Sequence, residues 1–90
     1  MITQHLLVRG RVQGVGYRQF LHQTALVLGC AGWVRNRVDG TVEAVIHGAE
    51  DAVERLLAAA RCGPRHSRVD SVEVTAAQDN YTRFEIRPTA

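Results

Sequence analysis

Residues 8–18, VRGRVQGVGYR, decide the fold because a glycine-rich loop there joins a strand pattern to a helix pattern. Upstream, residues 3–12 alternate between two faces, which predicts a β-strand. The inward face of this strand carries Leu6, Val8, Gly10 and Val12. Downstream, residues 17–28 repeat apolar side chains at helical spacing, and Gly29 suits the left-handed position that follows many helices. The stretch therefore predicts a strand, a loop and a helix in succession.

The rest of the chain predicts four more strands and one more helix. Two β-like runs, residues 32–38 and 41–47, flank Asp39-Gly40, a pair that indicates a two-residue type I′ hairpin turn. Residues 49–62 carry an apolar helical stripe that Gly63-Pro64 ends. Residues 68–76 and 81–87 alternate again. The inward positions expected on the strands are Val34, Asn36, Val38, Val42, Ala44, Ile46, Val72, Val74, Ala76, Phe84 and Ile86.

This order of elements is β-α-β-β-α-β with one short extra strand. Right-handed crossovers then place both helices on one face of the sheet. We therefore expect an α+β protein, a ferredoxin-like sandwich with a five-stranded, mostly antiparallel sheet. The length predicts a single domain over residues 1–90.

The charge distribution favours an anionic partner. Residues 1–38 hold five arginines and no acid, which gives +5, whereas residues 39–90 hold six arginines and nine acids, which gives −3. The net charge of +2 is too small to argue for nucleic acid. The chain has no lysine, which excludes Schiff-base chemistry and a Walker-type phosphate lysine.

Cysteine usage and hydropathy indicate a cytoplasmic protein without a zinc site. No CxxC pair or His/Cys cluster has zinc spacing. Cys30 and Cys62 each follow an apolar helical run closely and could approach one another, but we expect two free thiols in a reducing compartment. No apolar run approaches the ~20 residues of a membrane helix, and the start of the chain does not resemble a signal peptide.

The loop from Gln13 to Arg18 has the composition of an anion-binding cradle. Its glycines permit positive φ, so successive N–H groups can point inward beside the positive end of the following helix. Arg18 falls in the first turn of that helix, where the dipole disfavours a cation. An anion bound between them explains this placement, whereas the glycines alone fit an ordinary tight turn equally well.

Asn36 is the second anomaly, because it shares a strand face with Val34 and Val38. A buried amide needs partners, so it either supports the Asp39-Gly40 turn or holds a water molecule in the mouth of a site. We expect the other polar residues of these segments to be solvated surface residues and Trp33 to be a partly exposed packing residue. These surface residues are the arginines Arg9, Arg11, Arg35 and Arg37 and the histidines His5, His22, His47 and His66, which show no partner spacing.

The two blocks VRGRVQGVGYR and GWVRNRVDGTVEAVIHG, at residues 8–18 and 32–48, resemble the acylphosphatase family. The similarity covers essentially the whole chain and is carried by a VQGV-x-[FY]-R core together with W-V-x-N-x-x-D-G. It implies hydrolysis of carboxyl-phosphate bonds without a metal or cofactor, acting on a small acyl phosphate. Two departures from the family pattern are Arg37, where threonine is common, and Tyr17, where phenylalanine is commoner.

The resemblance also implies roles for individual residues. Arg18 and the loop residues Gln13, Gly14, Val15, Gly16 and Tyr17 would bind phosphate, and Asn36 would position the attacking water. We expect a monomer that binds neither nucleic acid nor membrane. The alternative is a non-catalytic ferredoxin-like module that binds RNA or a small molecule; the run TVEAVIHG at residues 41–48 has no aromatic residue for base stacking.

Overall fold

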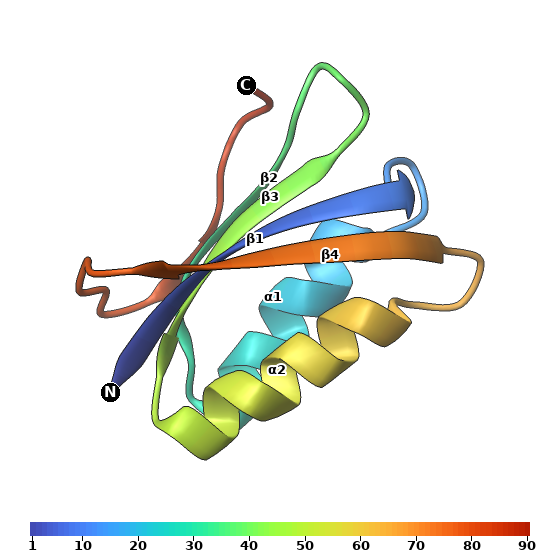
Figure 1. Ribbon diagram of the computed structural model, residues 1–90. Coiled ribbons are helices and arrows are strands. Elements are labelled where there is room, and N and C mark those ends of the chain that lie inside the picture. Colours follow the sequence, from blue (N-terminus) through green and yellow to red (C-terminus); the bar gives the residue numbers. More distant parts are fainter.

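The computed structural model describes residues 1–90 and confirms the ferredoxin-like α+β fold. The elements are β1 (Ile2–Arg11), α1 (Tyr17–Leu28), β2 (Ala31–Asn36), β3 (Val42–Gly48), α2 (Glu50–Cys62), β4 (Arg68–Ala77) and β5 (Phe84–Ile86). The five strands form one sheet in the order β4-β1-β3-β2-β5, antiparallel except where β5 runs parallel to β2. Both helices cover the same face of this sheet (Figure 1). No helix has the length and hydropathy needed to cross a membrane.

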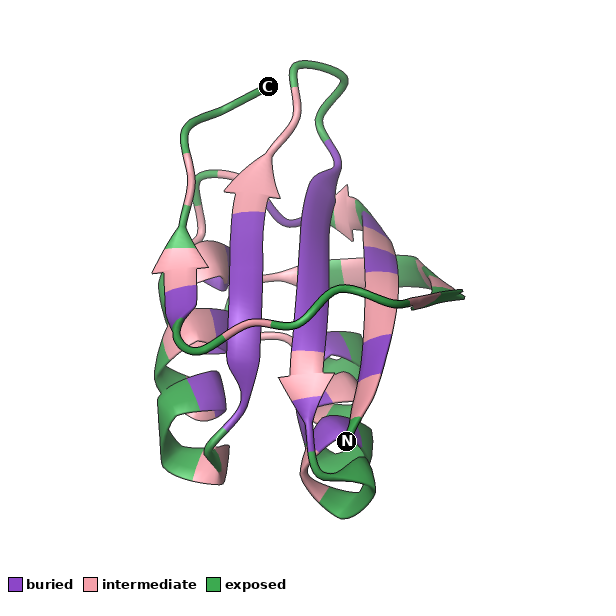
Figure 2. Ribbon diagram, turned by 90° about the vertical axis from the view of Figure 1, so that its left-hand side faces the viewer, coloured by how far each residue is buried: buried purple, intermediate pink, exposed green.

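The core lies between the helices and the three central strands, which carry most of the buried positions (Figure 2). Alternate residues of β1 and β3 point into it, as the period-2 pattern predicts. One helical stripe from each helix covers them. Fully buried members of this cluster are Leu6, Val8, Leu21, Ala25, Val34, Val42, Ala44, Ile46, Val53, Leu56 and Ala60.

The β2–β3 turn differs from the two-residue turn that the sequence predicts. Residues 37–41 connect the strands, and the Gly40 N–H donates to the Arg37 carbonyl at 3.1 Å. A type I′ turn needs positive φ at Asp39, but His66 is the only non-glycine residue with positive φ. The Asp39 carboxylate instead accepts from the N–H and hydroxyl of Thr41, at 3.0 and 2.6 Å. Val38 is therefore in the turn and 88% exposed, so its assignment to the core face is wrong.

The final strand is shorter than residues 81–87. Only Phe84–Ile86 pair as β5, and Ile86 is 41% exposed rather than inward, while Phe84 is buried. Beyond β5 the chain continues along β2, and the N–H of Ala90 donates to the Asn36 carbonyl at 3.1 Å. The Val38 N–H donates to the Ala90 carbonyl at 2.9 Å. The last residues thus lie beside the end of β2.

The open face of the sheet carries a partly buried ion network centred on Glu43. Its carboxylate contacts His5 Nε2 at 2.7 Å, Arg35 at 2.8 Å and Arg37 at 3.3 Å, so these side chains are not simply solvated. Trp33 is only 7% exposed, because the guanidinium groups of Arg35 and Arg87 lie 4.9 and 4.7 Å from its ring centroid. The segment joining β4 to β5 also crosses this face (Figure 2). The expectation of a partly exposed tryptophan is therefore wrong.

The Glu43 network predicts a pH-dependent contribution to stability. Burial by itself raises the pKa of Glu43, but hydrogen bonds from His5 and Arg35 outweigh it and hold the pKa below its ordinary value. Because the Glu43 carboxylate binds its proton less tightly in the folded state than in the unfolded state, its contribution to stability is present above the unfolded pKa. It is lost as the pH falls through the lowered folded pKa.

We predict that Glu43→Gln lowers the free energy of unfolding at neutral pH by about 1–3 kcal/mol, because Arg35 loses a charged acceptor. The difference from the unsubstituted protein should shrink as the pH falls below about 4.3, the ordinary pKa of Glu. Urea denaturation of both proteins at neutral pH and at about pH 3 measures this difference in the free energy of unfolding. An equal difference in the free energy of unfolding at both pH values would contradict a stabilising role for the charged Glu43 carboxylate.

Candidate functional site

The loop between β1 and α1 is fixed at both ends by buried side chains. Val12 and Tyr17 are each 1% exposed, and the Tyr17 hydroxyl donates to the Ala60 carbonyl at 2.7 Å. Between them Gly14 and Gly16 have φ values of 74° and 79°, the left-handed region that favours glycine. Burial of the Tyr17 ring raises the pKa of its hydroxyl far above the ordinary value, so it stays protonated and acts as a donor.

Main-chain N–H groups of this loop and of the first turn of α1 have no acceptor in the protein. The main-chain N–H groups of residues 13–19 donate no hydrogen bond to the backbone. The next N–H along the chain, that of Phe20, donates to the Gly16 carbonyl at 3.0 Å. Gly16 precedes α1 and has no side chain with which to cap it. Several donors and the positive end of the helix dipole therefore remain available at one place, an arrangement that can bind an anion.

Gly10, the first glycine of the quoted stretch, has a structural role away from this loop. It lies at an irregularity in the β1–β4 pairing, with φ of 133°. A Cβ atom there would come within 2.0 Å of the Arg68 carbonyl oxygen, so the two backbones can approach only because residue 10 is glycine.

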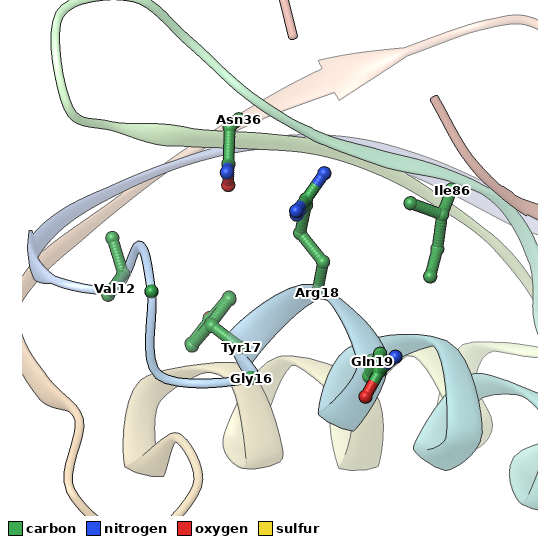
Figure 3. A pocket seen from close by; sticks show the side chains of 8 residues that line it. Val12, Gly16, Tyr17, Arg18, Gln19, Asn36 and Ile86 are labelled. Carbon is green, nitrogen blue, oxygen red and sulfur yellow. The ribbon is translucent and has the colours of Figure 1, made fainter. Parts of the chain in front are cut away.

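A pocket of about 340 Å³ opens where the loop, α1, β2 and β5 meet (Figure 3). The residues that line it are Val12, Gly14, Gly16, Tyr17, Arg18, Gln19, Asn36 and Ile86. Arg18 extends from the first turn of α1 into this space, between Asn36 and Ile86 in the view of Figure 3. Arg18 is half-buried, and its guanidinium forms none of the ion pairs in the protein. The pocket therefore contains an uncompensated positive charge.

Asn36 ends β2 and lies across the pocket from the loop (Figure 3). Its Oδ1 atom is buried and accepts no hydrogen bond from the protein. A buried acceptor without a donor is costly and rare, which is a physical reason to look for a ligand there. The side chain does not support the neighbouring turn, because Asp39 bonds to Thr41 in that turn instead. Asn36 lines the pocket, and its role in a site stays a prediction.

The pocket brings together most of the residues that the sequence singles out, with two exceptions. Gly14, Gly16, Tyr17, Arg18 and Asn36 line it. Val15, by contrast, is half-buried against the core cluster. Gln13 does not line the pocket, and its Nε2 donates to the carbonyls of Arg37 and Thr41 at 2.7 and 2.9 Å.

Sequence reasoning missed Ile86, Gln19 and Val12 as pocket residues. Val12 continues the inward face of β1, and Ile86 continues the alternation of a predicted strand, so both patterns indicate core residues. Gln19 follows Arg18 on α1 and is exposed, and no sequence pattern assigns it to the pocket.

The two cysteines lie at opposite ends of α2. Cys30 is buried beside Gly48, near the start of that helix, and burial together with the charge of Asp51 raises the pKa of its thiol. Cys62 is the exposed last residue of the same helix. The expectation that they could approach one another is wrong, and both are free. No cluster of three or more His, Cys, Asp or Glu side chains could hold a metal ion.

Comparisons with known proteins agree on one family. The family model described as Acylphosphatase matches residues 4–86. The acylphosphatase of Rhodospirillum rubrum is 61% identical over 87 residues, which cover 93% of this chain and 96% of that protein. The acylphosphatase of Thiobacillus denitrificans is 46% identical, with coverage of 97% and 98%. The crystal structure of acylphosphatase from Bacillus subtilis superposes with a TM-score of 0.92 at 38% identity, covering 97% of this chain and 99% of that one. The chain therefore belongs to the acylphosphatase family.

Proposed function

We propose that this acylphosphatase hydrolyses the carboxyl-phosphate bond of acyl phosphates in the pocket between the Gln13–Arg18 loop and Asn36. Arg18 and the main-chain N–H groups of the loop bind the phosphoryl group, and Asn36 positions the attacking water. The single observation that carries this assignment is that all three kinds of group lack partners in the protein. They are loop amides without acceptors, a guanidinium without an acid and a buried amide oxygen without a donor.

Phosphate binding rests on charge and on donor geometry. The guanidinium of Arg18 offers two parallel N–H donors that match two oxygens of a phosphoryl group. N–H groups of the loop and of the first turn of α1 bind the remaining oxygens, reinforced by the helix dipole. During transfer, negative charge spreads over the equatorial oxygens, and donors that are already oriented stabilise it without reorganisation.

Asn36 positions the nucleophilic water. Its buried Oδ1 accepts one hydrogen bond from a water molecule, which leaves a lone pair of that water free to attack phosphorus. The amide nitrogen can donate a further contact to the same region. Holding the water in line with the bond that breaks makes its attack on phosphorus effectively unimolecular.

The reaction needs no strong general acid, because its leaving group is a carboxylate. The bond from the water oxygen to phosphorus forms while the bond from phosphorus to the acyl oxygen breaks. The carboxylate leaves with the electron pair of the broken bond, and the proton of the water passes to a phosphate oxygen. This fits a pocket whose lining contains one arginine, one asparagine and one glutamine but no carboxylate or histidine. Catalysis is then mainly positioning and electrostatic stabilisation.

Base stacking on the open sheet face, which the alternative RNA-binding function requires, has little support. Trp33 lies on that face but is covered by Arg35 and Arg87, and β3 carries no aromatic residue. A monomeric state and a cytoplasmic location remain predictions from the sequence.

We predict that Arg18→Ala lowers kcat/KM for benzoyl phosphate by at least about 10²-fold, or roughly 3 kcal/mol of transition-state stabilisation. The inhibition constant of inorganic phosphate should rise as well, because the same guanidinium binds both. Arg55→Ala is the matched control, since Arg55 is exposed on α2 and forms no ion pair. Equal kinetics in the two variants would remove Arg18 from the mechanism.

We predict that Asn36→Ala lowers kcat about 10²-fold while the inhibition constant of phosphate stays within about threefold, because Asn36 contacts water rather than phosphate. Steady-state kinetics with phosphate as a competitive inhibitor measure both quantities. Asn80→Ala, an exposed loop position, provides the control. Weakened phosphate inhibition with unchanged turnover would reverse the two roles.

We predict that hydrolysis of acetyl phosphate and benzoyl phosphate continues at an unchanged rate when a chelator is added, because every group in the proposal belongs to the chain. Release of inorganic phosphate with and without the chelator is the measurement. Absent turnover combined with tight binding of single-stranded RNA would favour the alternative function.

A further inference from the structure

Gln13 belongs to the phosphate loop by sequence, but its side chain serves another part of the molecule. The Nε2 atom donates one hydrogen bond to the Arg37 carbonyl at 2.7 Å and a second to the Thr41 carbonyl at 2.9 Å. These two carbonyls belong to the first and last residues of the β2–β3 turn. Both protons of the amide are therefore used to connect the loop to this turn.

The two carbonyls that Gln13 contacts also close the turn. The Arg37 carbonyl accepts from the Gly40 N–H at 3.1 Å, and the Thr41 carbonyl accepts from the Arg37 N–H at 2.9 Å. With the two bonds from Gln13, each oxygen accepts twice and uses both lone pairs. A carbonyl oxygen cannot donate, so both bonds depend on the two N–H donors of the Gln13 amide.

The turn that Gln13 holds begins at the residue after Asn36. The loop itself is anchored to the core through Val12 and to α2 through the Tyr17 hydroxyl. The Gln13 amide is the hydrogen-bonded side-chain link between this anchored loop and the end of β2. It therefore restrains the turn that follows Asn36 relative to the loop.

We propose that Gln13 is a positioning residue, which aligns the water held by Asn36 with the phosphoryl group held by the loop, and not a phosphate ligand through its side chain. The inference rests on the roles proposed above for Arg18 and Asn36. Displacement of a reacting group by about 1 Å can cost roughly 10²-fold in rate. Loss of this link consequently acts on turnover more than on phosphate binding.

Two variants of Gln13 test this role with kinetics on benzoyl phosphate and inhibition by inorganic phosphate. Gln13→Leu removes both donors, and Gln13→Glu keeps the shape but places a carboxylate against two carbonyl oxygens. Both should lower kcat about tenfold or more while the phosphate inhibition constant stays within about threefold. Gln23→Leu, an exposed glutamine on α1 without contacts to the pocket, should leave both quantities unchanged.

A double-mutant cycle separates positioning from a general structural effect. If Gln13 acts through Asn36, adding Gln13→Leu to Asn36→Ala should lower kcat by less than about twofold further. The proposal would be overturned if the effects of the two substitutions on kcat multiplied in the double variant. It would also be overturned if the Gln13 variants lost phosphate inhibition in parallel with kcat, kept an unchanged kcat, or both failed to fold. Unchanged kcat in Asn36→Ala alone would instead refute the role of Asn36 in the proposed function.

Discussion

The site depends on one electrostatic constraint: the start of α1 and the Arg18 guanidinium lie together with no negative group between them. A helix N-terminus ordinarily carries an acidic or hydroxyl-bearing residue, yet α1 has a glycine before it and no acid in its first turn. This arrangement is unfavourable in the unliganded protein, and in the proposed function a bound phosphoryl group relieves it. The preference for an anion thus follows from groups that the fold holds in place rather than from residues that rearrange.

The ferredoxin-like sheet supplies the rigidity that this constraint requires. β1 and α1 are both packed into the core, so the loop between them is fixed at Val12 and at Tyr17. Asn36 ends β2, a central strand, and the chain beyond β5 bonds to it from the other side. The Gln13 amide then connects the loop to the turn after Asn36. The groups proposed to bind phosphate and to position water therefore come from separate elements, which these hydrogen bonds connect.

The sequence predicted the element order, both helices and the central residues of the pocket, because strong periodicity and glycine placement determine these locally. It failed where tertiary contacts decide. Asp39-Gly40 suggested a two-residue turn, but the carboxylate of Asp39 bonds to Thr41 and stabilises a longer one. Ile86 alternates as a core residue does, yet β5 ends there and leaves it beside Arg18. The direction of the Gln13 side chain depends on residues 24 and 28 positions away, which no local pattern reports.

The most direct test of the anion-binding loop is a titration of the protein with inorganic phosphate, followed by two-dimensional NMR of the backbone amides. The account predicts that the largest saturable shifts occur at the N–H groups of residues 14–19. It also predicts that Arg18→Ala weakens this binding at least about tenfold, since the charged partner is lost. Saturable shifts confined to another surface, or no shifts at these amides, would contradict it.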